Sequence, residues 1–509
     1  MILIVDFGSQ YNQLIARRVR ELHVYCQIEP PDIAISRIRS LAPEGIMLSG
    51  GPASIYEKES PKVDSQIFDL GIPVLGICYG MQYMIHSLGG KVERALKREY
   101  GLAELKVSDS KGLFHDVKGV SPCWMSHGDS ASQLPEGFKI TASTENTAAA
   151  AVENPEKKCY GLQFHPEVSH TPQGQKMLSN FLFRVCCCKK TWTMKSFIER
   201  EIEQIRSEVA DKSVILGLSG GVDSSVTAVL LNRAIGKHLT CIFVDNGLLS
   251  ADEGKRVKRI FRDRYKMNVR YVNARKRFLD LLRGVVDPER KRRIIGKTFI
   301  GVFEEEAAKI TGTHFLAQGT LYPDLIESRS SFGGPSVVIK SHHNVGGLPK
   351  KMRLKLIEPL KHLFKDEVRL LGKELGLPED IIYRHPFPGP GLAVRIIGDV
   401  TPRRLSILRQ ADDIVTEEIT RSDHYRKLWQ SFAILLPLKS VGIMGDKRTY
   451  EHIVVIRAVT SLDAMTADWA RLPHDLLVRI SNRIINEVRG INRVTYDISS
   501  KPPSTIEWE

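Results

Sequence analysis

The chain has 509 residues, of which 42% are hydrophobic and 26% are charged, a composition typical of a globular protein with packed cores. At the usual domain size this length predicts about three domains. No apolar run approaches the roughly 20 residues that span a bilayer, and residues 1–8 lack the features of a signal peptide. Eight cysteines without a Cys-x-x-Cys pair indicate neither a disulfide framework nor a zinc site, so we expect a cytoplasmic protein that does not contact a membrane.

The net charge of +14 is distributed unevenly. Residues 1–190 carry a net charge of +1, and the rest of the chain carries +13. A basic C-terminal part fits anionic ligands such as nucleotides. Nucleic acid is the alternative partner, but the sequence shows neither interleaved aromatic and basic residues nor zinc-finger spacing. We therefore expect no nucleic-acid partner.

Strand-like and helix-like runs alternate through the first part of the chain. The expected strands are residues 2–6, 45–48, 74–77 and 160–164, and the expected helices are residues 11–22, 81–88 and 173–184. This alternation predicts an α/β domain, residues 1–190, with a doubly wound parallel sheet. The cluster of Cys186, Cys187 and Cys188 near its end suits no disulfide framework and is expected to be small apolar residues at a helix end.

Cys78 lies between an expected strand and an expected helix, in the run Gly-Ile-Cys-Tyr-Gly-Met-Gln of residues 76–82. Glycines on both sides of Cys78 permit the strained turn of a nucleophile elbow. A helix N-terminus also stabilises a thiolate. Cys78 is therefore a candidate nucleophile.

A thiolate nucleophile needs a base, a group that orients the base, and donors for the developing oxyanion. His165 and Glu167 follow an expected strand in Gln-Phe-His-Pro-Glu and supply the first two. Gly50 and Gly51 follow another strand and offer unobstructed N–H groups, and the N–H of Tyr79 is the expected second donor.

This set, in this order, closely resembles the class I glutamine amidotransferases. The resemblance implies that Cys78 attacks the amide of glutamine and releases ammonia, that His165 acts as base and then acid, and that Glu167 orients His165. It also implies that glutamine contacts four further residues. These are Gln82, Ser126, His127 and Asp129. His127 is an alternative base, but the order Cys, His-x-Glu favours His165.

Residues 191–384 alternate in the same way and predict a second doubly wound sheet. The expected strands are residues 213–218, 240–244, 268–272 and 314–317, with helices at 194–209 and 226–234. The first of these strands runs into a glycine turn and then a helix. The turn and the start of the helix consist of Ser219, Gly220, Gly221, Val222, Asp223, Ser224 and Ser225.

Such a turn binds phosphate, because its glycines allow close approach and the helix start offers unpaired N–H groups. It is not a Walker loop, because the lysine and the spacing are missing. The run Ser-Gly-Gly-x-Asp-Ser resembles the ATP pyrophosphatase family, which splits ATP into AMP and pyrophosphate. ATP use requires Mg²⁺, and Asp223 is its expected ligand; the alternative role of Asp223 is that of an acid in the first turn of a helix.

Two further strand ends are expected to border the nucleotide, because ligands lie at the carboxyl ends of parallel strands. The first contains Val244 and the second is residues 317–324, which include Asp324. Residues 292–297 are either part of a lid over this site or a basic helix start.

The run His-Pro-Phe-Pro-Gly-Pro-Gly at 385–391 excludes regular structure and separates a third part, residues 385–509. There we expect helices at 402–420 and 475–488 and strands at 432–436 and 453–458, which predicts a smaller α+β domain.

Several long motifs closely resemble the glutamine-hydrolysing GMP synthase family. They are residues 219–225, 317–324, 341–347, 384–391 and 501–509. The resemblance runs from the first residue to the last and implies amination of xanthosine monophosphate (XMP) to GMP: ATP adenylates O2 of the purine and ammonia displaces AMP. It also implies a homodimer formed through the third domain, with XMP contacts at Asp324, Lys501 and Glu507.

One position departs from the family, which often has an arginine a few residues after its Asp-Asn-Gly. Here Ser250 follows Leu248 and Leu249, and Lys255 and Arg256 are the substitutes nearby. Two alternatives to the family remain. A glutamine-dependent NAD synthetase usually carries a nitrilase-type Glu-Lys-Cys set, which is absent here, and a non-catalytic nucleotide-binding regulator would not need Cys78 with His165 and Glu167.

Overall fold

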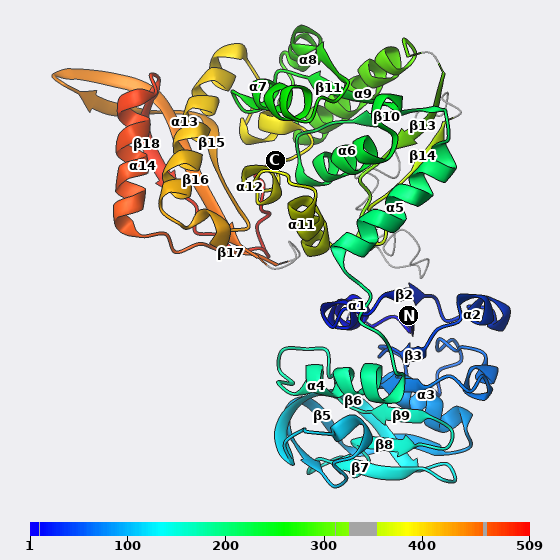
Figure 1. The fold of residues 1–509 in the computed structure, drawn as a ribbon. Coiled ribbons are helices and arrows are strands. Elements are labelled where there is room, and N and C mark those ends of the chain that lie inside the picture. Colours follow the sequence, from blue (N-terminus) through cyan, green and yellow to red (C-terminus); the bar gives the residue numbers. More distant parts are fainter. Residues whose placement is uncertain (10, 311, 325–353, 462–465) are drawn as a thin grey trace. The chain divides into compact units, whose positions relative to one another are not determined.

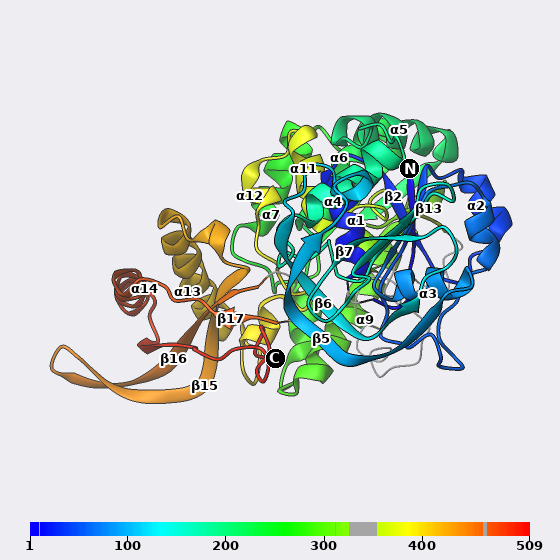
Figure 2. The same cartoon turned by 90° about the horizontal axis from the view of Figure 1, so that it is seen from below.

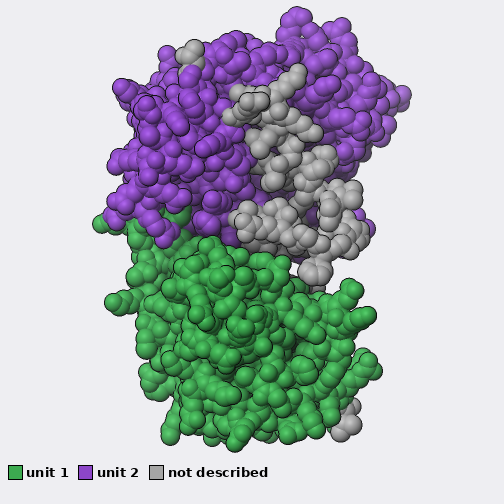
Figure 3. Space-filling model, turned by 90° about the vertical axis from the view of Figure 1, so that its right-hand side faces the viewer, with its two compact units in different colours: residues 1–197 green, residues 198–509 purple. Residues whose placement is uncertain are grey.

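The computed structural model describes residues 1–9, 11–310, 312–324, 354–461 and 466–509. The chain divides into two compact units, Met1–Phe197 and Ile198–Glu509 (Figure 3). None of the described helices is long and apolar enough to cross a membrane. The predicted domain boundary between residues 384 and 385 stays a prediction.

The first unit contains a nine-stranded mixed sheet in the order β2-β1-β3-β4-β9-β8-β7-β5-β6 (Figure 1). Its strands are β1 (Ile2–Val5), β2 (Cys26–Glu29), β3 (Gly45–Leu48), β4 (Val74–Ile77), β5 (Lys91–Val107), β6 (Val120–Gln133), β7 (Lys139–Ser143), β8 (Ala151–Asn154) and β9 (Cys159–Leu162). Its helices are α1 (Asn12–Glu21), α2 (Ile35–Leu41), α3 (Tyr79–Ser87) and α4 (Gly174–Asn180). A π-helical turn, Phe181–Val185, continues α4.

Four strands of the parallel half of this sheet, β1, β3, β4 and β9, were expected from the sequence, whereas β2 was not. Every residue of β1, β3, β4 and β9 is buried, as continuous apolar strands covered on both faces should be. The antiparallel half, β5 to β8, was not expected. Exposed and buried residues alternate along β6, because one face of an antiparallel strand meets solvent, and such mixed runs lack the apolar signal of a buried strand.

The second unit begins with a five-stranded parallel sheet in the order β12-β11-β10-β13-β14. Its strands are β10 (Ser213–Gly217), β11 (Leu239–Asp245), β12 (Val269–Asn273), β13 (Thr313–Ala317) and β14 (Lys355–Ile357). The associated helices are α5 (Met194–Val209), which starts in the first unit, α6 (Val222–Ile235), α7 (Glu253–Val257), α8 (Arg275–Leu282), α9 (Pro288–Ala307), α11 (Lys365–Glu374) and α12 (Glu379–Ile382).

A second sheet follows, in which β16 (Lys447–Thr460) pairs with β15 (Gln430–Met444), β17 (Asp468–Trp469) and β18 (Ile491–Tyr496). Helices α13 (Pro402–Arg421) and α14 (His474–Glu487) pack against it. The β15–β16 hairpin extends away from the rest of this unit (Figures 1 and 2).

One apolar core joins the two sheets of the second unit. It includes Ile215 and Ile242 of the parallel sheet, Leu408 of α13, and Leu435 and Ile456 of the second sheet. Both sheets belong to the compact unit Ile198–Glu509. Residues 385–390 form neither helix nor strand, as expected, and a 3₁₀ turn, Gly391–Arg395, follows them.

Candidate active sites

The nucleophile elbow at Cys78 has the strained geometry that the sequence predicts. Cys78 precedes α3 with φ 51° and ψ −109°, a region that non-glycine residues rarely adopt. A Cβ atom on Gly80 would lie 2.3 Å from the carbonyl oxygen of Leu48, and one on Gly76 would lie 2.6 Å from the amide nitrogen of Met81. The glycines around Cys78 are therefore required by close backbone packing.

His165 and Glu167 form a buried pair three residues beyond β9. Nδ1 of His165 lies 2.8 Å from Oε1 of Glu167, and the side chains are 5% and 0% exposed. Burial opposes protonation of His165, but its interactions with Cys78 and Glu167 outweigh burial and raise the pKa of His165 to about 10. Such an imidazolium stabilises a thiolate on Cys78.

The backbone of this pair is held by β6. The N–H of His165 donates to the carbonyl of Trp124, and the hydroxyl of Thr171 donates to the carbonyl of His165 at 2.7 Å. The ring of Tyr11 packs edge-on against the imidazole at 5.0 Å between centroids. These contacts fix the position of the ring.

The predicted oxyanion glycines lie next to the nucleophile. A Cβ on Gly50 would lie 3.1 Å from Cε1 of His165 and 3.7 Å from Cβ of Cys78. Gly51 is packed against the carbonyl of Phe7, where a Cβ would come within 2.7 Å. Tyr79 is the first residue of α3, so its N–H belongs to the group that helix geometry leaves without an intrahelical partner.

The predicted glutamine-binding segment contacts Cys78. Sγ of Cys78 lies 3.6 Å from the carbonyl oxygen of Ser126. Gln82 is buried and donates to the carbonyl of Asp129 at 2.8 Å, and Ser54 donates to the Asp129 carboxylate at 2.6 Å. Gln163, to which the sequence assigned no role, places its amide nitrogen 3.7 Å from Sγ of Cys78.

The phosphate loop of the second unit joins β10 to α6. Gly220 has φ +80°, and Gly221 precedes the helix. The hydroxyls of Ser219 and Ser224 lie 2.9 Å apart, while the hydroxyl of the buried Ser225 donates to the carbonyl of Gly221 at 2.7 Å. The loop is thus ordered by its own serines, and Ser219 is the exposed one.

Two ion pairs flank this loop, and their basic partners were not identified from the sequence. Nζ of Lys365 lies 2.7 Å and 2.6 Å from the two carboxylate oxygens of Asp223. Arg384 donates to both carboxylate oxygens of Glu253 at 2.5 Å and to the carbonyl of Gly220 at 3.1 Å. Neither partner is near the loop in sequence, so only the fold could reveal them.

Of the other predicted strand ends, the one after β13 approaches the loop. A Cβ on Gly319, just after β13, would lie 3.3 Å from Cβ of Asp223. At the end of β11, beside the buried Val244, the Asp245 carboxylate receives hydrogen bonds from Arg275, Tyr271 and the N–H of Gly247. Burial opposes ionisation of Asp245, but these donors lower its pKa.

The proposed substitutes for the missing arginine are engaged elsewhere. Lys255 is largely exposed and pairs with Asp252 at 3.0 Å, and Arg256 donates to the carbonyl of Asp380. The hydroxyl of Ser250 lies 3.2 Å from Glu253, so Ser250 belongs to the Glu253–Arg384 pair beside the phosphate loop.

The residues expected to contact XMP are held by hydrogen bonds and an ion pair within the chain. Asp324 accepts from the N–H of Leu321 at 3.1 Å, and the backbone of Lys501 pairs with Ala467. Glu507 is paired with Arg395 at 2.9 Å and accepts from Gln430 at 2.6 Å. The motif at 341–347 lies outside the described residues.

Residues 292–297 form part of α9, so the basic helix start is the alternative that the structure adopts. The preceding Lys291 is fully buried and donates to the carbonyls of Ala393 and Ile396 and to the carboxylate of Glu509. Cys186 and Cys188 are buried beside a π-helical turn, which agrees with their expected apolar role at a helix end, whereas Cys187 is exposed.

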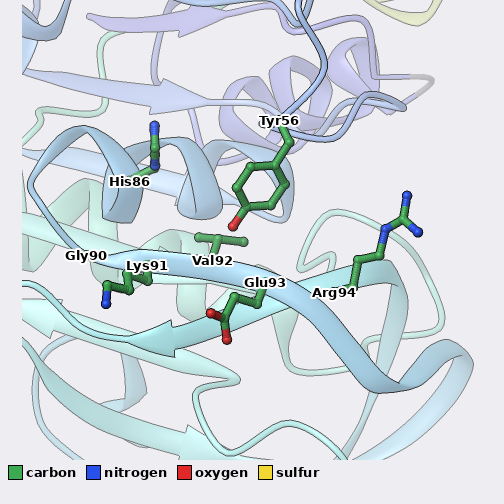
Figure 4. Close-up of a pocket in the computed structure, with 7 residues that line it drawn as sticks. All are labelled: Tyr56, His86, Gly90, Lys91, Val92, Glu93 and Arg94. Carbon is green, nitrogen blue, oxygen red and sulfur yellow. The ribbon is translucent and has the colours of Figure 1, made fainter.

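A surface cavity of about 440 Å³ lies in the first unit between the end of α3 and β5 (Figure 4). Its lining includes Tyr56, His86, Lys91, Glu93 and Arg94, none of which was a predicted site residue. Arg94 is the cross-strand partner of Asp129, so the cavity borders the glutamine-binding segment on β6.

Each part of the chain matches a protein family. Residues 3–185 match the family described as Glutamine amidotransferase class-I, residues 193–277 match NAD synthase, and residues 417–508 match the GMP synthase C terminal domain. Together with the fold, these matches define a class I glutamine amidotransferase domain joined to an NAD synthase-like domain on one chain.

Full-length relatives narrow this class to one family. GMP synthase (glutamine-hydrolyzing) of Brachyspira hyodysenteriae is 61% identical over 508 residues, which cover 100% of this chain and 99% of that protein. The proteins of the same name from Clostridium botulinum and Rippkaea orientalis are 58% and 57% identical, cover 100% of this chain, and are covered over 99% and 95% of their own lengths. The chain belongs to the glutamine-hydrolysing GMP synthase family, which confirms the resemblance and the fold class expected from the sequence.

Proposed function

We propose that this protein is a ligase that makes GMP from XMP with glutamine as nitrogen donor and ATP as energy source. The observation that carries the proposal is that one chain holds two different candidate sites. The Cys78–His165–Glu167 arrangement is suited to releasing ammonia from an amide, and the loop at 219–225 is suited to holding the phosphates of a nucleotide.

In the first site the thiolate of Cys78 attacks the amide carbon of glutamine. The protonated His165 gives its proton to the departing nitrogen, so ammonia leaves and a glutamyl thioester remains. His165 then takes a proton from the water that hydrolyses the thioester, and Glu167 holds the imidazole in orientation throughout. The N–H groups of Gly51 and Tyr79 stabilise the oxyanion, and the segment from Ser126 to Asp129 with Gln82 binds the amino-acid end of glutamine.

In the second site the N–H groups of the loop and the start of α6 receive the phosphates of ATP. Asp223 would hold Mg²⁺ together with phosphate oxygens, an arrangement that needs only one or two carboxylates from the protein. The ion, when bound, neutralises the phosphate charge. Asp223 is now paired with Lys365, so on nucleotide binding Lys365 exchanges the carboxylate for a phosphate oxygen.

XMP is placed beside this site with contacts from Asp324, Lys501 and Glu507. Attack of the purine O2 on the α-phosphate of ATP forms adenylyl-XMP and releases pyrophosphate. Ammonia then adds to the purine carbon, AMP departs, and GMP remains. The ion pair between Arg395 and Glu507 orders the C-terminal segment that carries Lys501.

The test is to supply either glutamine or ammonium and to follow the absorbance change as XMP becomes GMP. Cys78→Ala should abolish synthesis from glutamine and retain synthesis from ammonium, whereas Asp223→Asn should reduce both by at least tenfold. Cys187→Ala, at an exposed cysteine, is the matched control and should retain both. If the wild type makes no GMP from either nitrogen source, the ligase proposal is wrong.

The proposal includes a homodimer and a cytoplasmic location. Val441, Ile443 and Tyr450 are 59%, 76% and 65% exposed on the β15–β16 hairpin, and Val441 is the cross-strand partner of Tyr450. Residues two apart on a strand share a face, so these side chains form one apolar patch suited to a second copy of the chain. All eight cysteines are free thiols, which suits a reducing compartment.

A further inference from the structure

The first unit contains a second buried histidine–glutamate pair, on strands β5 and β6. His127 and Glu99 are direct cross-strand partners on β6 and β5, and they are 4% and 7% exposed. Nε2 of His127 lies 3.7 Å from the Glu99 carboxylate, so the two groups are adjacent without a direct hydrogen bond.

Thr147 bridges the two side chains. Its hydroxyl lies 2.7 Å from the carboxylate of Glu99 and 3.4 Å from Nε2 of His127. The hydroxyl of Thr144 also contacts both Glu99 oxygens at 3.0 Å and accepts from the N–H of Thr147. The carboxylate therefore anchors a short turn whose threonine faces the imidazole.

The other nitrogen of the imidazole holds the glutamine-binding segment. Nδ1 of His127 lies 2.9 Å from the carbonyl oxygen of Asp129, the same oxygen that accepts from Gln82. A carbonyl oxygen only accepts, so Nδ1 must carry a hydrogen. Burial, opposed by Asp129 and Glu99, lowers the pKa of His127. The Thr147 hydroxyl donates its single hydrogen to Glu99, and its oxygen lies against Nε2 of His127.

This segment begins at the nucleophile. The carbonyl of Ser126 lies 3.6 Å from Sγ of Cys78, three residues before the carbonyl that His127 holds. A change in the orientation of the His127 ring would therefore shift the backbone of β6 between Ser126 and Asp129, which contacts Sγ of Cys78. No polar atom of the ring is directed toward Cys78 in any of these contacts.

We propose that His127 is a positioning residue, oriented by Thr147 and Glu99, that fixes the segment from Ser126 to Asp129 against Cys78 and thereby sets the affinity for glutamine. The inference rests on the proposed glutaminase activity and assigns His127 a role other than direct contact with the substrate. It predicts that the hydroxyl of Thr147, which is remote from Cys78 in sequence, controls the KM for glutamine.

The test compares Thr147→Val with Thr147→Ser in the full chain. Valine keeps the shape and removes the hydroxyl, whereas serine keeps the hydroxyl. Thr147→Val should raise the KM for glutamine roughly tenfold, the size expected from one buried hydrogen bond, with little change in kcat. Thr147→Ser should stay within about twofold of wild type. Glu145→Gln, an exposed change on the same turn, is the control and should have no effect.

Two further readouts separate positioning from general instability. Ammonium-driven synthesis should stay at the wild-type rate in every variant, and the ¹⁵N shifts of the His127 ring should report Nδ1–H in the wild type and change in Thr147→Val but not in Thr147→Ser. Equal KM values for the valine and serine variants, or a parallel loss of ammonium-driven synthesis, would overturn the inference.

If Thr147→Val does not fold, Glu99→Gln is the second variant and should raise the KM for glutamine in the same way; a wild-type KM there would also overturn the inference. Failure of the proposed function is distinguishable, because then the wild type itself would make no GMP from either nitrogen source.

Discussion

At the scale of single residues, the charge state of His165 is set by its two neighbours. Its pKa, raised to about 10 by Cys78 and Glu167 against the effect of burial, lies above the ordinary value of 6.5. The stabilisation from this raised pKa is therefore fully present below about pH 6.5 and is lost as the pH rises through about 10. Through neutral pH the imidazolium faces the thiol.

Replacing Glu167 tests this arrangement. Glu167→Gln removes the negative charge 2.8 Å from Nδ1, so the pKa of His165 should fall and less thiolate should be present at pH 7. Alkylation of Cys78 by iodoacetamide at pH 7 should therefore be slower in Glu167→Gln than in the wild type, because the thiolate is the species that reacts. The measurement uses a Cys187→Ser background, because Cys187 is the exposed cysteine. An unchanged rate would show that Glu167 does not control the protonation of His165.

At the scale of elements, the elbow between β4 and α3 depends on close packing that no side chain can enter. Gly80→Ala would place a methyl group 2.3 Å from the carbonyl oxygen of Leu48, so backbone must shift. We expect a loss of about 1–3 kcal/mol in the free energy of unfolding of the first unit and loss of glutamine-driven synthesis.

Thermal unfolding and the two nitrogen-source assays measure these effects. Gly119→Ala is the control, because a Cβ there meets no atom within 4 Å and its φ is not positive. If the two alanine variants behave alike, close packing at Gly80 does not determine the elbow.

The phosphate loop is held from outside by Arg384. Arg384→Gln would release the Gly220 carbonyl and leave the Glu253 side chain, which is 3% exposed, without its ion-pair partner. Breaking a buried pair costs about 3–5 kcal/mol, so the thermal midpoint should fall, and the KM for ATP should rise with either nitrogen source.

A double change, Arg384→Gln with Glu253→Gln, separates the two effects. It removes the unpaired charge and should recover much of the midpoint without recovering the KM for ATP. Arg426→Gln removes an exposed ion pair with Glu379 and serves as the control. Recovery of both quantities in the double variant would show that Arg384 acts only through stability.

Helices and strands were predictable where their own residues carry a clear hydrophobic pattern. The bounds of β3, β4 and α5 coincide with the expected runs, because continuous apolar segments and a long amphipathic helix carry strong local patterns. Strand β6 escaped prediction because one of its faces meets solvent, and the pairing of β5 to β8 depends on partners elsewhere in the sheet.

At the scale of the whole molecule, the apolar patch on the β15–β16 hairpin predicts self-association. Ile443→Lys places a charge at a side chain that is 76% exposed, so it should weaken a dimer without unfolding the chain. Sedimentation velocity should show a dimer for the wild type and a shift toward monomer for the variant. Ile140→Lys, at a half-exposed isoleucine of the first unit, should leave the sedimentation unchanged. A monomeric wild type would contradict the dimer.

The sequence by itself determined the chemistry of the two sites and their order along the chain. A nucleophile elbow and a phosphate loop are built from consecutive residues whose glycines and serines act locally, so their motifs were recognisable without a fold. The pairing of His165 with Glu167 was accessible for the same reason, because only Pro166 separates them.

Tertiary structure alone decided which distant residues support those motifs. Lys365 is 142 positions from Asp223 in sequence, and Arg384 is 131 positions from Glu253. Thr147, which contacts His127 of β6, lies in the turn between β7 and β8. Such contacts depend on the order and register of strands in the sheet. A charged or hydroxyl side chain carries no local signal of the partner that the sheet will bring to it.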